Sequence, residues 1–141
     1  ESYPETVALY FLHFPVPKEH PFAETMALMA EAARTPGDDS AFWALHDLFY
    51  SKRWIDANRL EEESAAVVQQ AGLDVNDWKV RRADPTVMAR IDADKSMGRR
   101  VFLRGTPTLF IDGVKYEGYR SFDQLREIVE QRIVLKKAKE Q

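Results

Sequence analysis

Histidines and carboxylates are the side chains of this sequence best suited to hold a metal ion. His13, His20 and His46 provide imidazole nitrogens, and Glu19 and Asp47 add carboxylate oxygens close to two of them along the chain. These are ligands that zinc accepts, but their spacing fits no recognised zinc motif. The sequence therefore predicts no metal site: His20 shapes the entry to a helix, and His46 packs on an aromatic helix face.

Thiol chemistry requires cysteine, and the 141 residues contain none. This excludes a catalytic thiol, a redox pair, a disulfide framework and a thiolate metal site within these residues. It does not identify the compartment, because a domain of this length can bury enough apolar surface to be stable without disulfides. No motif for an organic cofactor is present, and no cofactor is predicted.

Aromatic and arginine side chains could bind a partner. A peptide groove could be lined by aromatic residues of one region, namely Phe42, Trp43, Phe49, Tyr50 and Trp54. Their helical spacing favours core packing instead. Arg99, Arg100 and Arg104 could bind an acidic partner or a phosphate, but charged loops are common and no glycine-rich phosphate loop accompanies them. A solvated loop is the preferred interpretation.

Composition narrows the class of protein. With 45% hydrophobic residues and 141 in total, the chain is long enough for one globular domain. The net charge of −3 gives no overall attraction to nucleic acid. No apolar run approaches the roughly 20 residues needed to cross a bilayer, and the first residues lack the features of a signal peptide. A mature or trimmed start is compatible with this.

Hydrophobic spacing predicts one strand followed by a series of helices. The apolar and β-branched run Thr6–Phe14, closed by prolines, is typical of a buried strand. Helical spacing and capping residues then predict helices over Pro21–Arg34, from Asp39 and Ser40, over Asn58–Ala71, after Asp74, and from Asp84-Pro85 towards Gly98. Gly72 is expected to end the third helix.

The last forty residues follow a different pattern. Asp112-Gly113 separates two short β-rich runs, Thr108–Ile111 and Val114–Tyr116, and is a strong signal for a tight hairpin. Ser121 is placed to cap a final helix. The chain should therefore end in a β-hairpin followed by a helix.

Several fragments, taken in order, carry a family resemblance. They are Phe14-Pro15-Val16-Pro17, His20-Pro21-Phe22-Ala23, Ala30-Glu31-Ala32-Ala33, Phe42-Trp43-Ala44-Leu45-His46-Asp47, Gly72-Leu73-Asp74 and Val101–Gly113 with Gly118. Together they resemble the carboxy-terminal part of a DsbA-like thioredoxin-fold disulfide oxidoreductase. The resemblance implies an α/β thioredoxin-like fold in which residues 18–100 form a helical insertion. Residues 1–141 would then be a single, incomplete domain.

One departure from the family concerns the sheet. The family begins with a strand leading to Cys-x-x-Cys at a helix start, and that strand lies between the strands expected at Thr6–Phe14 and Thr108–Ile111. Without it, unpaired backbone groups in an apolar setting cost about 1–3 kcal/mol each. We therefore expect an upstream segment or a second chain to complete the sheet.

The site residues implied by the resemblance are Gly105, Thr106 and Pro107. In the family the matching proline is cis and lies against the redox pair, and the backbone of the preceding residue pairs with an extended substrate peptide. We therefore predict a cis bond at Pro107 and substrate binding along this loop. No catalytic residue is predicted within the chain.

Three functions remain open at this point. The first is the substrate-docking and structural part of a thiol-disulfide oxidoreductase or isomerase, which acts on exported, extended or unfolded polypeptides with a redox partner protein. The second is a cysteine-free thioredoxin-like module that only binds peptides. The third is a relative of the glutathione transferases. The resemblance implies a periplasmic or otherwise exported location.

Overall fold

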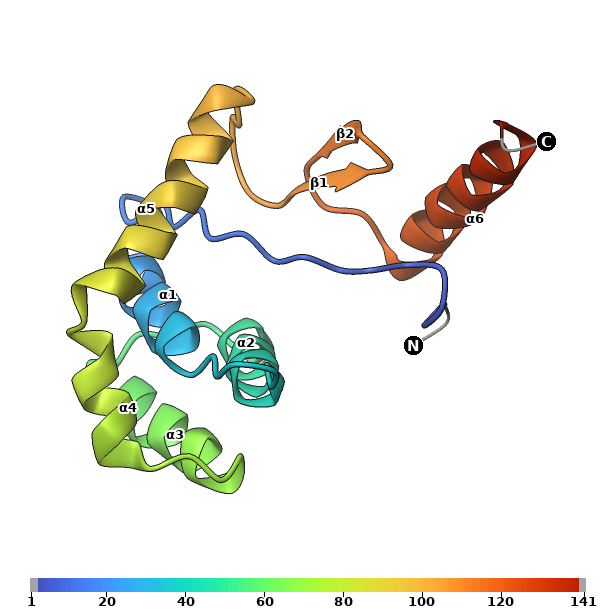
Figure 1. The fold of residues 1–141 in the computed structure, drawn as a ribbon. Coiled ribbons are helices and arrows are strands. Elements are labelled where there is room, and N and C mark those ends of the chain that lie inside the picture. The colour runs from blue at the N-terminus through green and yellow to red at the C-terminus, as the bar shows by residue number, and fades with distance from the viewer. Residues whose placement is uncertain (1–2, 140–141) are drawn as a thin grey trace. The chain divides into compact units, whose positions relative to one another are not determined.

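The computed structural model describes residues 3–139 and contains mainly helices. The elements, in chain order, are α1 (Ala23–Ala32), α2 (Ser40–Ser51), α3 (Ala57–Gln70), α4 (Val75–Arg82), α5 (Pro85–Arg100), β1 (Thr108–Ile111), β2 (Val114–Glu117) and α6 (Phe122–Lys139) (Figure 1). The described residues form two compact units. One consists of residues 12–97, and the other combines residues 3–11 with residues 98–139.

The unit of residues 12–97 contains the hydrophobic core. Helix α1 contacts α2 and α4, and α3 contacts α2 and α4. The largest fully buried apolar side chains of the described chain all lie here: Trp78, Phe42, Met29, Leu45, Leu60, Ile91 and Val68. Burying a large apolar side chain contributes about 1.5–3 kcal/mol to stability, so these side chains stabilise the packing of the helices in this unit.

Three helix ends in this unit follow the capping residues expected from the sequence. The expectation that Asp39 caps α2 is wrong: its side chain makes no capping hydrogen bond, and Ser40 N–H donates to Asp38 Oδ1 instead (2.8 Å). The carboxylate of Asp74 accepts hydrogen bonds from the backbone N–H groups of Asn76 (2.8 Å) and Asp77 (2.9 Å) at the start of α4. Asp84 accepts from Thr86 N–H in the same way, ahead of α5. Gly72 ends α3 with a φ of +84°, a conformation that glycine adopts at little cost. The predicted helices and these caps are confirmed.

The Asp74 cap gives a first prediction. Replacing Asp74 with Ala removes the acceptor for two backbone donors and should lower the free energy of unfolding by about 1 kcal/mol. Asp74→Asn is the matched control, since asparagine caps about as well as aspartate. Urea unfolding followed by tryptophan fluorescence measures both, because Trp43, Trp54 and Trp78 all lie in residues 12–97. If Asp74→Ala and Asp74→Asn lowered the free energy of unfolding equally, the loss would not come from the capping hydrogen bonds.

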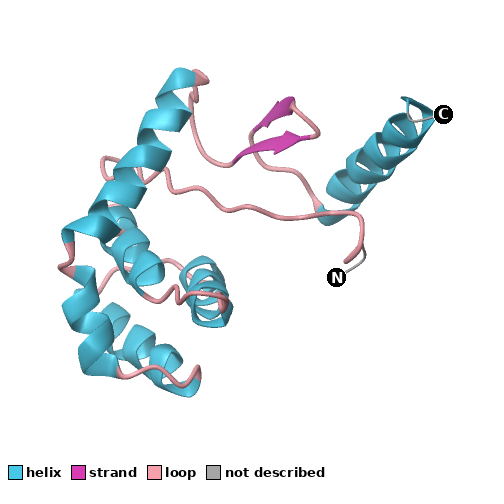
Figure 2. Ribbon diagram, in the orientation of Figure 1, coloured by secondary structure: helices cyan, strands magenta, loops and turns pink. Residues whose placement is uncertain are grey.

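The other unit contains the β-hairpin. Strands β1 and β2 pair antiparallel, with Thr108 opposite Glu117 and Ile111 opposite Val114 (Figure 2). Asp112 and Gly113 form the turn with φ values of 49° and 77°. Positive φ at both central residues matches the right-handed twist of the flanking strands, as in a type I′ turn. The predicted hairpin is confirmed.

The strand predicted over Thr6–Phe14 is wrong. This segment has no regular secondary structure, and among residues 3–139 the sheet contains β1 and β2 alone. An extended run becomes a strand only when a neighbour accepts and donates its backbone hydrogen bonds, and no described strand does so. Several of its apolar side chains are exposed to solvent, among them Leu9 (70%) and Tyr10 (83%), while Phe11 and Phe14 are half-buried.

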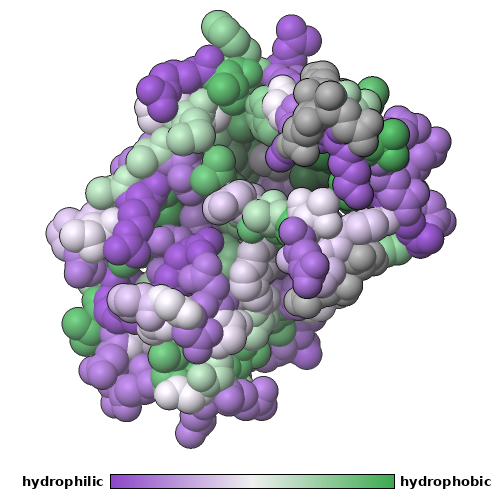
Figure 3. All heavy atoms as spheres, turned by 45° about the vertical axis from the view of Figure 1, so that its right-hand side comes forward, coloured by the Kyte–Doolittle hydropathy of each residue, from purple (hydrophilic) through white to green (hydrophobic). Residues whose placement is uncertain are grey.

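The unit that holds the hairpin has no buried apolar side chain among its described residues. Helix α6 begins with a capping box, since Ser121 N–H donates to Gln124 Oε1 (2.9 Å) and Gln124 N–H donates to Ser121 Oγ (3.3 Å). Even so, Phe122, Val134 and Phe110 are largely exposed. On the face drawn in Figure 3, hydrophobic residues lie at the surface between hydrophilic ones. This unit therefore presents apolar surface that nothing in the described chain buries.

None of the described helices combines the length and the apolar character that a membrane span requires.

Candidate functional site

The loop of Gly105, Thr106 and Pro107 connects the end of α5 to β1, and all three residues are exposed. The Thr106–Pro107 peptide bond is cis. Two hydrogen bonds hold the loop against the hairpin: Thr108 Oγ1 donates to the carbonyl of Gly105 (2.7 Å), and Gly118 N–H donates to the carbonyl of Pro107 (2.9 Å). The three predicted site residues therefore form one exposed loop at the start of β1.

The backbone of Thr106 is available to a partner. Within residues 3–139, neither its N–H nor its carbonyl takes part in a hydrogen bond. Strand β1 pairs with β2 alone in the same part of the chain, so its other edge also offers donors and acceptors. An extended peptide can bind to such an edge by adding a strand. Whether the loop binds substrate stays a prediction.

The turn that follows α5 has an unusual residue at its centre. Phe102 has a φ of +54° and is 81% exposed. Its N–H donates to the carbonyl of Arg99 (3.1 Å), and Leu103 N–H donates to the carbonyl of Gly98 (2.9 Å). These two bonds form the helix-ending arrangement in which glycine usually takes the left-handed position. Sequence reasoning missed Phe102. The one available signal was that no glycine follows the predicted end of this helix, so that another residue must take the left-handed position.

The charges beside the loop are mostly positive. Arg99, Arg100 and Arg104 are exposed, and none of them forms an ion pair with another described residue. Lys115 pairs with Glu117 at 2.7 Å. The hydrogen bond from Lys115, together with its positive charge and that of Arg104, holds the pKa of Glu117 below its ordinary value.

The histidines do not come together. His13 is buried, with its Nε2 3.3 Å from Glu31 Oε2, while His46 Nδ1 lies 3.1 Å from Asp47 Oδ1. His20 is exposed before α1. Across residues 3–139, no three histidine or carboxylate side chains are arranged to hold a metal ion.

The aromatic residues proposed for a peptide groove divide between core and surface. Phe42, Phe49 and Trp54 are buried, and Trp54 Nε1 donates to the carbonyl of Phe49 (3.2 Å). Tyr50 is 74% exposed. The core interpretation of the buried three is therefore confirmed.

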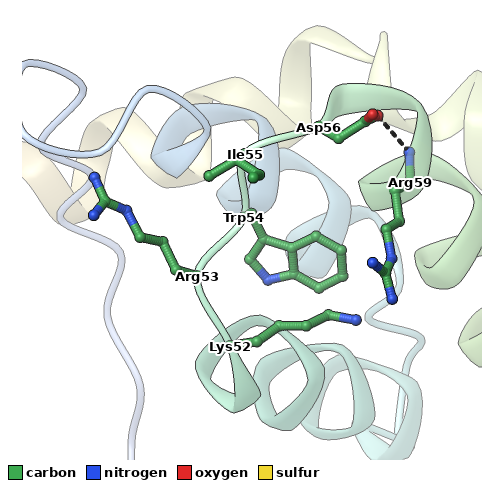
Figure 4. Close-up of a pocket in the computed structure, with 6 residues that line it drawn as sticks. All are labelled: Lys52, Arg53, Trp54, Ile55, Asp56 and Arg59. Atoms are coloured by element: carbon green, nitrogen blue, oxygen red, sulfur yellow. Dashed lines mark hydrogen bonds between the residues drawn. The ribbon is translucent and has the colours of Figure 1, made fainter.

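A cavity of about 130 Å³ lies where α2 leads into α3. Figure 4 shows the residues that line it: Lys52, Arg53, Trp54, Ile55, Asp56 and Arg59 (Figure 4). Lys52 Nζ lies 4.5 Å from the centre of the Trp54 ring, and Glu63 pairs with both Lys52 and Arg59. Glu63 thus already neutralises these two cations in part, which weakens their attraction for an anion.

Curated relatives match this chain over part of their length. They are the Na(+)/H(+) antiporter NhaA 1 of Salinispora arenicola (29% identical over 117 residues, 83% of this chain and 17% of the relative), the Na(+)/H(+) antiporter NhaA 3 of Salinispora tropica (28% over 127 residues, 88% and 18%) and the Na(+)/H(+) antiporter NhaA 1 of Mycolicibacterium vanbaalenii (32% over 110 residues, 75% and 16%). The chain spans less than a fifth of the length of these relatives. No solved structure matches the chain.

A family model settles the class of the fold. The model described as Thioredoxin matches residues 3–131, which is most of the chain. This span includes the helices of residues 12–97, the loop of residues 105–107 and the hairpin. The α/β thioredoxin-like fold expected from the sequence is therefore confirmed, and the chain belongs to the thioredoxin family.

Proposed function

We propose that the chain is the substrate-docking and structural part of a thiol-disulfide oxidoreductase domain. The observation that carries the proposal is the exposed Gly105–Pro107 loop, with the free backbone of Thr106 beside the open edge of β1. An extended or unfolded polypeptide would pair with this backbone and present its sulfur to a redox pair.

The cysteines of the reaction must come from residues outside this sequence, because the chain has none. In the proposed reaction, one thiolate attacks a substrate disulfide and forms a mixed disulfide, while the departing substrate sulfur leaves as a thiolate. A second cysteine then attacks the mixed disulfide, which leaves the enzyme oxidised and the substrate reduced. The reverse direction oxidises a substrate dithiol, and a redox partner protein would restore the starting state.

The surface of the hairpin unit supports the same proposal. Leu9, Tyr10 and Phe110 are exposed in a unit that lacks a buried apolar side chain among its described residues. A strand added between Thr6–Phe14 and β1 would pair the free backbone groups and cover apolar surface, each buried CH₂ group contributing about 0.8 kcal/mol. We propose that an upstream segment of the same polypeptide supplies this strand, and with it the cysteines.

The relatives suggest where such a domain works. Proteins named as Na(+)/H(+) antiporters contain a segment similar to this chain, so we propose that the chain is part of a longer polypeptide. We further propose that the domain faces an oxidising compartment outside the cytoplasm, where disulfides persist. An alkaline phosphatase fusion placed after Gln141 should be active if this location is right, and inactive if the domain is cytoplasmic.

The test compares the native-length protein with the 141-residue chain. A peptide that carries a fluorescence-quenched disulfide should exchange with the native-length protein and not with the shorter chain. Serine substitutions at the upstream cysteines should abolish exchange and leave peptide binding intact. A native-length protein without a Cys-x-x-Cys, or one that has the pair but shows no exchange, would contradict the proposal. Peptide binding that survives complete thiol blockade in a protein without the pair would identify a cysteine-free binding module instead.

A further inference from the structure

The turn after α5 exposes an aromatic side chain at an energetic cost. Phe102 adopts a left-handed φ of +54° at the position where helices usually end with glycine, and its ring is 81% exposed. A side chain with a Cβ destabilises this conformation by about 1 kcal/mol relative to glycine, and an exposed ring adds no packing in return. No contact among the described residues therefore explains a phenylalanine here, and backbone outliers of this kind cluster at functional sites.

Hydrogen bonds fix the position of this turn. The bonds from Phe102 N–H and Leu103 N–H to the last turn of α5 hold it on one side. Lys115 on β2 donates from its Nζ to the carbonyl of Phe102 (3.0 Å) on the other. The backbone that carries the exposed ring is therefore held in place relative to the hairpin, so less backbone ordering is needed when a partner binds.

The chain segment that contains Phe102 carries a net positive charge. Residues 98–120 contain five arginines and lysines and two carboxylates, whereas the whole chain has a net charge of −3. Arg120 donates to backbone carbonyls, and Lys115 pairs with Glu117. The remaining cations are the exposed Arg99, Arg100 and Arg104, which we group with the ring as the Phe102 patch.

We propose that the Phe102 patch binds the acidic flank of an extended polypeptide that docks at Thr106. The inference rests on the proposed function and names its substrate class: a disordered segment with aspartate or glutamate residues and one apolar side chain. The apolar side chain packs on Phe102, and the carboxylates pair with the arginines. Aromatic side chains, phenylalanine included, and arginine are enriched at protein interfaces. The overall negative charge opposes a nucleic acid as the occupant.

The test measures binding of labelled, cysteine-free extended peptides to the native-length protein by fluorescence anisotropy. An acidic peptide should bind at least fivefold more tightly than its glutamine counterpart and tighter still than its lysine counterpart. Phe102→Gly keeps the backbone conformation, so it should fold at least as stably as the wild type and lose about tenfold in affinity for the acidic peptide. Phe102→Asn, which also tolerates the left-handed region, should give the same loss.

Matched controls separate the patch from general effects. Tyr119→Ala removes another exposed aromatic ring of the same unit and should change affinity less than twofold. Replacing Arg99, Arg100 and Arg104 with Gln should abolish the preference for acidic peptides, whereas Lys136→Gln with Lys137→Gln should leave it unchanged. The preference should also weaken at high salt.

The possible outcomes distinguish a failure of the Phe102 patch from a failure of the proposed function. If all peptides bind equally well and Phe102→Gly binds as the wild type does, the Phe102 patch is not part of the site and the docking function stands. If a single-stranded oligonucleotide binds at the patch more tightly than the acidic peptide, the inference is overturned. If no peptide binds and no thiol exchange occurs, the proposed function fails and the substrate class fails with it.

Discussion

Replacing Trp78 with Ala should lower the free energy of unfolding of the helical unit by about 3–5 kcal/mol. Trp78 is 1% exposed, and its Nε1 donates to the carbonyl of Met29 (2.9 Å), which ties α4 to α1. The guanidinium of Arg82 lies 4.4 Å from the centre of the ring. The substitution removes all three contributions and leaves a cavity. Because small domains are stable by only about 5–15 kcal/mol, the loss should be obvious in urea unfolding followed by circular dichroism.

Two further variants identify the cause of that loss. Trp78→Phe keeps most of the apolar surface and loses the hydrogen bond to Met29, so it should cost about 1–3 kcal/mol, less than the Ala variant. Val80→Ala changes an exposed residue of the same helix and should stay within about 0.5 kcal/mol of the wild type. A Trp78→Ala protein within 1 kcal/mol of the wild type would show that α1 and α4 are held together by other contacts.

Local chemistry made much of this fold predictable. Helix ends are marked by residues that act on the backbone close by, whatever the rest of the chain does. Asp74 and Asp84 accept hydrogen bonds from free N–H groups at a helix start, Pro85 lacks an N–H group that would need a partner, and Gly72 adopts the positive φ that ends a helix. Asp112-Gly113 gave the hairpin for the same reason. The buried Phe42 and Phe49 could be assigned to a core from helical spacing alone, whereas Trp54 is buried from the connection between α2 and α3.

The predicted strand over Thr6–Phe14 failed for a non-local reason. An apolar β-branched run shows that a segment can be a strand, but pairing depends on a neighbour that lies elsewhere in the sequence. Within the described residues that neighbour does not exist, so the run stays irregular. The expectation that another strand completes this sheet stays a prediction.

The candidate site was predictable in part. Gly105, Thr106 and Pro107 were found through an ordered set of family motifs, because no charge or nucleophile marks them. Phe102 escaped because the features that single it out are a φ angle and an exposed ring, which residue type and spacing do not reveal. Our proposal extends the candidate site from one loop to the turn before it.

A buried group of charges in the helical unit should make stability depend on pH. Glu31 is 5% exposed, and its carboxylate pairs with Arg34 Nε at 2.9 Å and Arg90 Nη1 at 3.3 Å. His13 Nε2 lies 3.3 Å away. Burial alone would raise the pKa of Glu31, but the hydrogen bond from His13 and the charge and hydrogen bond of Arg34 outweigh it, so the pKa lies below its ordinary value.

The direction of this shift decides the pH dependence. A carboxyl whose pKa is lower in the folded state stabilises the fold above its ordinary pKa of 4.5, and that stabilisation disappears as the pH falls through the folded value. Glu31→Gln removes the negative charge but keeps the shape, and it leaves His13, Arg34 and Arg90 without their common partner. We expect a loss of about 2–3 kcal/mol at pH 7, less than for a fully buried pair because both arginines are partly exposed.

Below about pH 4.5 the difference between wild type and Glu31→Gln should shrink, because the wild-type carboxyl is then being protonated as well. The hydrogen bond from Arg82 also lowers the pKa of Glu61, and the backbone N–H of Thr86 lowers the pKa of Asp84. Both carboxyls are present in wild type and variant, so their contributions cancel in the difference. Urea unfolding from pH 3 to pH 7 measures the difference in the free energy of unfolding between wild type and Glu31→Gln. The control is Glu62→Gln, which changes an exposed residue. Parallel stability curves for wild type and Glu31→Gln would mean that the charge of Glu31 does not hold His13 and the arginines in the fold.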